Sequence, residues 1–562
     1  MTVEARPHRL WTIAATIGVL AFGFRLMNVR DLPNDHYMHL AWAQQLLFGE
    51  RPGRDFVDPG MPLTYLLSAL VQWLWAGPFS EAVLCCVMLA ITAAVVFVVS
   101  TELTGSRIAG VLAAAVVVGF YPRLYSYPKV LVPAVALYLL HRYAVLPRMS
   151  RLWLLAIWIA AATLLRHDLG VYAAAGTGAG LLSVHWGSVR ASISALARCA
   201  GAVIAVMIPY LIFVQWSEGV FQHLHQAVEF ARGEAHQRFL APPPFPFFGD
   251  ARGLAAWSID DSAVLLFYLA YLIPLVALVL VLRRARPQPV TASVSAALAM
   301  SALYLLVVLR HPIVSRIQDV ATLFAILGVW TIADAKREGK VAFAAALLVC
   351  ALGAASIWHL GNLTERVRDT RVADGPGVMQ RTIQGIEETG TQWPWERYWP
   401  AGELPEAIKY LNACTAPTDK VLLTWAAPEY YYFARRPFGA GHALFLPPDA
   451  FTNREDQELM LARMVRERIP VILINETRAK EFTDAYGQVD RYLRQAYVPA
   501  GHFQIRDGSE ITIATRRDLK AERTYGADRW PCDFDSRAAS RTASIMLDGS
   551  AIPLPAISNA VP

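Results

Sequence analysis

Residues 34–66 read NDHYMHLAWAQQLLFGERPGRDFVDPGMPLTYL, and this stretch decides the fold. It follows the first apolar segment and opens with a carboxylate, Asp35. A short helix through its first half has one polar and one apolar side, which is typical of a helix that lies in a membrane interface. A second acid, Asp58, precedes a second amphipathic stretch. We therefore predict a reaction site held at one face of a membrane.

The composition is that of a membrane protein with soluble parts. Of 562 residues, 55% are hydrophobic and 17% are charged, and the mean hydropathy is +0.36. Globular domains average about 45–50% apolar and about 25% charged residues. The net charge of +6 does not indicate nucleic-acid binding, because the basic residues lie in short loops between apolar runs.

The apolar runs predict a mainly α, polytopic fold of about eleven spans. Two shorter amphipathic segments, 36–48 and 61–76, are assigned to the interface within the first outer loop, although the second also suits a short span. The first span is interpreted as a retained signal anchor. The spans are expected near 11–28, 82–101, 108–121, 130–146, 152–166, 169–186, 196–216, 262–282, 292–309, 313–333 and 341–359.

The positive-inside rule orients these spans. With the N-terminus in the cytoplasm, every cytoplasmic loop is basic, and the 34–66 loop, the segment 217–261 and everything after residue 360 lie outside. We expect a bacterial inner membrane protein with a periplasmic or extracellular C-terminal domain. The segment 217–261 contains a proline cluster, which suits either a lid or a disordered connector.

From residue 361 to about 530 the pattern predicts an outer α/β domain, followed by a loosely ordered tail over 531–562. Strands are expected at 421–427 and 471–476, helices at 454–468 and 478–495, and a hairpin over 503–517 that turns at Asp507-Gly508. No P-loop or G-x-G-x-x-G motif occurs, so no nucleotide site is expected. Cys414 and Cys532 could pair if this region faces an oxidising space, and spacing alone leaves that open.

Several outer-face residues are candidates for chemistry. Asp35 suits a general base toward a hydroxyl or a helix cap. Cations that break the positive-inside trend suit either a phosphate site or snorkelling to lipid headgroups. These cations and their neighbours are Arg123, Tyr127 and Lys129; Arg166, His167 and Asp168; and Arg310, His311 and Arg316.

His36 and His39 are three residues apart and could share one face of a helix. Two histidines are too few for a metal site without a third ligand. We therefore predict a solvated interfacial pair and no cofactor, with a divalent metal left open.

An enzyme on the outer face has no cytoplasmic nucleotide available and must draw its activated substrate from the lipid phase. A lipid-phosphate sugar fits, because cations neutralise the leaving phosphate and one base suffices to deprotonate the acceptor hydroxyl. Such a base contributes about 10²–10⁴ in rate.

The chain resembles the GT-C superfamily of polyprenyl-phosphate-sugar glycosyltransferases, and within it the branch of the aminoarabinose transferase and the protein O-mannosyltransferase-like proteins. The resemblance covers the layout of roughly residues 10–360 and is most specific in the first outer loop, in LFGE at 47–50 and RDFVDPGMPLTYLL at 54–67. It implies that Asp35 is the base. Many relatives carry Asp-Glu there and an acid in the second outer loop, where this chain has Lys129 instead, which favours a phosphate-binding role for that residue.

We therefore expect an inverting membrane glycosyltransferase that moves a sugar from a polyprenyl phosphate to a glycan, lipid or protein acceptor in the cell envelope. Asp35 would be the base, and Arg123, Lys129, Arg166, Arg310 and Arg316 would bind phosphate, with Asp58, Tyr127, His167 and Asp168 in supporting roles. The alternatives are a lipid or solute transporter, which usually shows paired repeats or mid-membrane charges, and a non-catalytic scaffold. The sequence names neither the sugar nor the acceptor.

Overall fold

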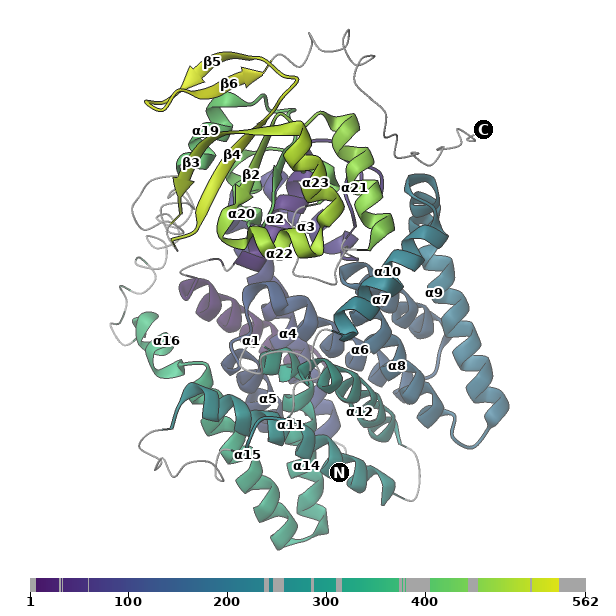
Figure 1. The fold of residues 1–562 in the computed structure, drawn as a ribbon. Coiled ribbons are helices and arrows are strands. Elements are labelled where there is room, and N and C mark those ends of the chain that lie inside the picture. The colour runs from purple at the N-terminus through teal and green to yellow at the C-terminus, as the bar shows by residue number, and fades with distance from the viewer. Residues whose placement is uncertain are drawn as a thin grey trace. The chain divides into compact units, whose positions relative to one another are not determined.

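The computed structural model describes residues 7–29, 32, 34–58, 60–236, 242–245, 257–284, 288–309, 316–372, 375, 377, 380, 405–442, 453–505 and 508–534. The chain divides into two compact units, Met1–Glu403 and Leu404–Pro562 (Figure 1). This division falls later than the boundary predicted at residue 360, because the helix that follows the last apolar segment still belongs to the first unit.

The named elements of the first unit, over its described residues, are all helices. Its N-terminal half contains α1 (Pro7–Met27), α2 (Asn34–Leu47), α3 (Pro62–Leu74), α4 (Pro78–Thr104), α5 (Arg107–Gly119), η1 (Leu124–Ser126), α6 (Tyr127–Val145), α7 (Met149–Leu165) and α8 (His167–Val184). Its C-terminal half contains α9 (Val189–Ser217), α10 (Val220–His236), α11 (Ile259–Leu282), α12 (Pro289–Val308), η3 (Ile317–Val320), α14 (Ala321–Glu338), α15 (Lys340–Leu360) and α16 (Leu363–Asp369).

Seven of the described helices are long and apolar enough to cross a membrane: α1, α4, α9, α11, α12, η3 with α14, and α15. Each coincides with a predicted span. The four other predicted spans are also helices, α5 to α8. Of these, α5 and α7 are shorter apolar helices. The helix α6 contains Lys129 and Arg142, and α8 begins with His167 and Asp168, and these polar residues lower the mean hydropathy of both helices.

The first loop forms the two helices predicted for it, α2 and α3, which pack against each other. In α3, one face is buried through Thr64, Tyr65 and Ser68, whereas Leu66, Leu70 and Trp73 on the other face are exposed. An exposed apolar face on a short helix is what a position in a membrane interface requires.

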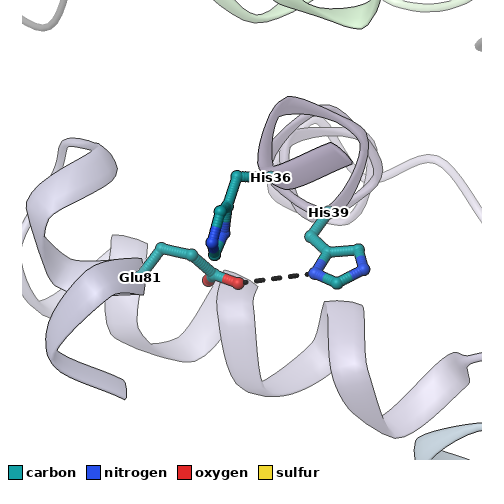
Figure 2. A group of neighbouring side chains, drawn as sticks. All are labelled: His36, His39 and Glu81. Carbon is teal, nitrogen blue, oxygen red and sulfur yellow. Dashed lines mark ion pairs between the residues drawn. The ribbon is translucent and has the colours of Figure 1, made fainter. Parts of the chain in front are cut away.

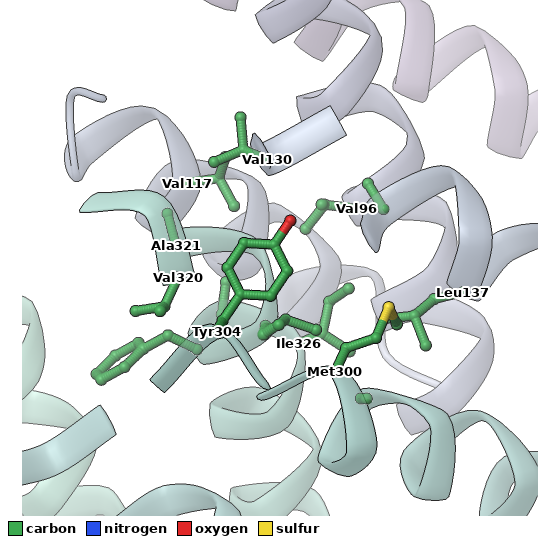
Figure 3. Packing of buried hydrophobic residues seen from close by; sticks show 14 of the residues in the cluster. Val96, Val117, Val130, Leu137, Met300, Tyr304, Val320, Ala321 and Ile326 are labelled. Atoms are coloured by element: carbon green, nitrogen blue, oxygen red, sulfur yellow. The ribbon is translucent and has the colours of Figure 1, made fainter. Parts of the chain in front are cut away.

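The core of this unit lies where α4, α5, α6, α12 and α14 meet. Figure 3 shows Val96, Val117, Val130 and Tyr304 packed together with residues of η3 and α14. Within the segment 217–261, α10 spans Val220–His236, so this part is not a disordered connector. Within the prolines, Pro243 accepts a hydrogen bond from the Tyr268 hydroxyl of α11, at 2.5 Å.

The second unit contains a four-stranded sheet in the order β1-β2-β4-β3, in which only β1 and β2 are parallel. The strands are β1 (Val421–Leu423), β2 (Val471–Asn475), β3 (Tyr497–Gln504) and β4 (Glu510–Arg516), with a separate ribbon of β5 (Ala521–Tyr525) and β6 (Trp530–Phe534). The helices are α19 (Glu406–Cys414), α20 (Pro428–Ala434), α21 (Arg454–Glu467), α22 (Ala479–Ala485) and α23 (Gly487–Ala496).

The predicted hairpin is present as β3 and β4, and Gly508 follows its turn with φ +84°. The helix predicted over 478–495 is broken into η6 (Glu476–Arg478), α22 and α23. The tail was predicted to start at residue 531, but β6 continues to Phe534 and pairs with β5. Cys414 and Cys532 form a disulfide, which ties α19 to β6.

Candidate functional site

A buried ion pair joins two helix starts in the first unit. Lys129, in the first turn of α6, donates to Asp319 of η3 at 2.6 Å. The Lys129 and Asp319 side chains are only 5% and 7% exposed. Arg316 approaches the same carboxylate at 3.9 Å. The second oxygen of Asp319, Oδ1, has no hydrogen-bond partner among the described residues.

A second ion pair lies beside the first. Arg166 caps α8 and contacts Asp168 with two parallel hydrogen bonds, the Nε to Oδ1 bond being 2.6 Å. Both side chains keep about a third of their surface exposed, at 30% and 32%. Arg166 also interacts electrostatically with Lys129 and with Asp319, so the two pairs form one network.

Tyrosines hold this network in place. Tyr304 of α12 donates to the Lys129 carbonyl at 2.7 Å. Its ring packs at a tilt against Tyr172 of α8, with ring centroids 4.8 Å apart. The Tyr172 hydroxyl reaches Asp168 at 3.4 Å. The ion pairs therefore rest on the packed core.

The network gathers the N-termini of α6 and α8 and the η3 turn that leads into α14. A helix N-terminus carries a partial positive charge and orphan N–H groups, so it favours anions. Together with Lys129, Arg166 and Arg316, these termini make a strongly anion-favouring surface, of the kind that binds phosphate.

Asp35 reaches this surface through a tyrosine. Asp35 lies in the first turn of α2 and hydrogen-bonds Tyr125 of η1. Arg123 donates to the same Tyr125 hydroxyl at 2.9 Å, and the Lys129 ammonium lies 5.8 Å from the Tyr125 ring centroid. Burial and the charge of Asp35 raise the pKa of Tyr125, so the phenol keeps its proton and donates to the carboxylate.

Asp58 occupies a neighbouring cluster. It accepts from the Gly60 N–H at 2.8 Å and from Tyr210 at 3.3 Å. Burial raises the pKa of Asp58, against the opposing effects of the Gly60 bond, His223 and His167. Gly60 has φ +76°, and a Cβ there would lie 2.9 Å from His167 Nδ1. Glycine therefore lets this loop pack on the start of α8.

Arg166, His167 and Asp168 thus divide between two clusters. Arg166 and Asp168 join Lys129, whereas the His167 ring faces His223 of α10, with centroids 5.5 Å apart. His223 is in turn held by Glu218 at 2.6 Å. This second cluster links the loop at Asp58 and Gly60 to the α7–α8 junction and the α9–α10 junction.

The structure does not place every predicted residue in the network. Tyr127 is fully buried and accepts a hydrogen bond from Arg25, so it supports the core instead. Lys129 is in the network but its ammonium is committed to Asp319. Arg310 and His311 lie outside the described residues.

Sequence reasoning missed Tyr125, Asp319 and the pair of Glu218 and His223. Tyr125 was visible in the motif YPRLYSYPK, between two cations already singled out. Asp319 could have been suspected as an acid at the start of an apolar span. His36 and His39 were predicted to be solvated, and this was wrong: they are 0% and 7% exposed, because α2 packs this face against its neighbours.

The comparisons with known proteins are sparse. No family model matches this chain, and no curated protein matches it. Among solved structures, the chain aligns with the Archaeoglobus fulgidus oligosaccharyltransferase in complex with zinc and sulfate at 12% identity and a TM-score of 0.40. The alignment covers 90% of this chain and 72% of that one. A likeness at this level assigns no activity.

Proposed function

We propose that this protein is an integral membrane glycosyltransferase of the GT-C type, which transfers a sugar from a polyprenyl-phosphate donor to an acceptor hydroxyl with inversion. The observation that carries the proposal is the link from Asp35 through Tyr125 to the network of Lys129, Arg166 and Arg316. One carboxylate stands beside several cations and helix N-termini, which is what such a transfer needs.

The donor phosphate would be bound by the more accessible cations. Arg123 is exposed, and the Arg166 and Arg316 side chains are 30% and 28% exposed. The buried Lys129, which is paired with Asp319, would contribute positive charge to the phosphate site without contacting the phosphate directly. Guanidinium groups bind phosphate oxygens with charge-assisted hydrogen bonds and stabilise the negative charge that grows on the leaving group.

Asp35 would act as the base. It takes the proton of the acceptor hydroxyl while the acceptor oxygen bonds to the anomeric carbon and the bond from that carbon to the phosphate oxygen breaks. The polyprenyl phosphate leaves with the electron pair, so no acid is needed. Attack from the side opposite the leaving phosphate inverts the anomeric centre.

The position of the charges favours an enzyme over a transporter. Lys129, Asp319, Arg166 and Asp168 lie at the starts of helices. A transporter instead places its ionisable residues near the middle of the membrane. A scaffold gives no reason to bury a lysine–aspartate pair beside two further arginines.

The disulfide between Cys414 and Cys532 supports an outer location for the second unit, because disulfides persist in oxidising compartments. We propose that the N-terminus is cytoplasmic and that residues 404–534 face the periplasm or the exterior of a bacterial inner membrane.

The test is sugar transfer by purified protein from a panel of polyprenyl-phosphate sugars. Asp35→Asn should lower the transfer rate by about 10²–10⁴ while the protein stays folded. Asp260→Asn is the matched control, because Asp260 is also a first-turn aspartate but is exposed on α11. Near-normal transfer by Asp35→Asn would refute the mechanism, and no binding of a polyprenyl phosphate by the wild type would refute the donor class.

A further inference from the structure

Three possible metal ligands meet beneath α2. His36 and His39 project from α2 toward Glu81 in the first turn of α4, as Figure 2 shows. One ligand atom from each side chain lies within 4.8 Å of the other two. His39 Nδ1 is 3.7 Å from Glu81 Oε1. All three residues are buried, with exposures of 0%, 7% and 2%.

His36 has no hydrogen-bond partner in this arrangement. Both of its ring nitrogens are buried, and neither makes a hydrogen bond to a described residue. Its ring contacts are edge-to-face with His39 and Tyr125. A buried polar atom without a partner loses its hydrogen bonds to water and forms no hydrogen bond in the protein, which costs free energy. An ordinary ion pair between His39 and Glu81 leaves this cost unexplained, whereas a metal bound by His36 removes it.

The chemical state of the ligands also suits a metal. Burial lowers the pKa of His36 well below its ordinary value, with His39 and Arg25 adding to the effect. A neutral imidazole is the form of histidine that ligates metals. Arg25 is held by Tyr121, Tyr127 and the Asn28 carbonyl, so its charge is directed to other partners.

The carboxylate is oriented for ligation from its far side. Glu81 Oε2 accepts a hydrogen bond from Ser68 of α3, and Gln72 donates to the Ser68 hydroxyl at 3.4 Å. Oε1 is left facing His39. A ligating carboxylate held by hydrogen bonds to its second oxygen is the usual supporting arrangement at protein metal sites.

We propose that His36, His39 and Glu81 bind a first-row divalent cation, with Zn²⁺ as the first candidate. Two imidazoles and one carboxylate with a fourth position open to water are a common zinc ligand set. Zinc bonds of about 2.0–2.2 Å require the three ligand atoms to move closer together, which rotation of the side chains allows.

The metal would join the start of α4 to α2, one residue from Asp35 and in contact with Tyr125 through the His36 ring. Its role would be to position α2 and the Tyr125 link. This metal site is argued from His36, His39 and Glu81 alone, and it is independent of whether the protein transfers sugars.

The test is metal content of the full-length protein, purified in detergent with a tag that contains no histidine, stripped with chelator and then offered Zn²⁺. We expect one equivalent of zinc in the wild type by mass spectrometry and a higher melting temperature with zinc than without. Reloading with Co²⁺ should give the visible absorption of a four-coordinate site.

His36→Ala, His39→Ala and Glu81→Gln should each lose the bound metal, and Ser68→Ala should weaken binding by about 10-fold. His225→Ala is the matched control, because His225 of α10 is exposed, and it should bind zinc as the wild type does. If the ligand variants fail to fold, the change in the melting temperature of the wild type on adding zinc decides whether the protein binds zinc. Absence of stoichiometric metal and of that shift, or retention of metal by folded ligand variants, would overturn the proposal.

Discussion

Breaking the Lys129–Asp319 pair tests whether the ion network is functional or only structural. The two perturbations are Lys129→Met, which leaves a buried carboxylate, and the double variant Lys129→Met with Asp319→Leu, which removes both charges. The pair is 2.6 Å long and almost fully buried. Removing one partner of such a pair typically costs about 3–5 kcal/mol, whereas replacing both by apolar residues is close to neutral.

The contacts of Asp319 place the expected cost of Lys129→Met at the lower end of the range of about 3–5 kcal/mol that is typical for removing one partner of a buried pair. After loss of Lys129, the Asp319 carboxylate still has Arg316 at 3.9 Å. Arg316 is farther from the carboxylate and more exposed than Lys129, so its attraction offsets only part of the loss. Asp319 Oδ1 has no hydrogen bond to compensate. We therefore expect Lys129→Met to lower the free energy of unfolding by about 3 kcal/mol.

The measurement is unfolding in mixed micelles, followed by transfer activity of each folded variant. The double variant should recover most of the lost stability, because neither charge is then left buried without its partner, but it should not recover transfer. If the double variant restored both stability and transfer, the pair would be structural and the phosphate-binding role of the network would be refuted. If Lys129→Met lost no stability, the burial argument itself would be wrong.

Three further outcomes follow from the contacts. Tyr125→Phe keeps the ring but removes the hydroxyl between Asp35 and Arg123, so kcat should fall about 10-fold or more with little change in folding. The control is Tyr138→Phe, because Tyr138 is a half-buried tyrosine inside α6. Equal kcat for both variants would contradict the link. Burial disfavours the charged form of His223, but the hydrogen bond and the charge of Glu218 outweigh burial and raise the pKa of His223. The charge of Asp58 raises this pKa further, and the His167 ring faces His223. Because the pKa of His223 is raised in the folded state, the stability gained from protonated His223 is complete below about pH 6.5 and is lost as the pH rises through the raised pKa. The melting temperature of the wild type should therefore fall over this pH range. The melting temperature of Glu218→Gln should change less over the same range. Reduction of the Cys414–Cys532 disulfide, which closes a separation of 118 residues, should destabilise the second unit by about 2–5 kcal/mol, as measured by proteolysis with and without reductant, and an unchanged cleavage rate would count against it.

The local elements of the fold were predictable because each depends on neighbouring residues. Apolar runs predict helices wherever the backbone must satisfy its own hydrogen bonds, and every predicted span is a helix. The β3–β4 hairpin follows from alternating residues on both sides of a turn. The break between α22 and α23 was missed because it depends on packing: Phe482 and Tyr486 stack on each other in the buried cluster of this unit.

The site was predictable only in part, because its pairings join distant segments. The positive-inside rule drew attention to Lys129, Arg166 and Arg316 as unusual cations, and in the structure these residues lie close to one another. Nothing local shows that Lys129 pairs with Asp319, which lies 190 residues away. In the same way, Glu81 completes the pair of His36 and His39 only through the packing of α2 on the following helices.

The charge balance of the network suggests which donor it fits. Among its described members, the cations Arg123, Lys129, Arg166 and Arg316 and the acids Asp35, Asp168 and Asp319 leave one net positive charge. A sugar linked through a single phosphate carries one negative charge and would neutralise it. In the proposed mechanism, Asp35 would hold the acceptor's proton after transfer, and the free lipid phosphate would approach two negative charges at pH 7. Protonation of Asp35 would raise the net charge of the network by one, and this increase matches the additional negative charge on the product phosphate. The charges of the network and of the phosphate would therefore stay balanced through the reaction. A diphosphate-linked sugar breaks this match at the start, so monophosphate-linked donors should have the higher kcat/KM in paired assays on one lipid, and a preference for the diphosphate would refute the assignment of these residues to the donor phosphate.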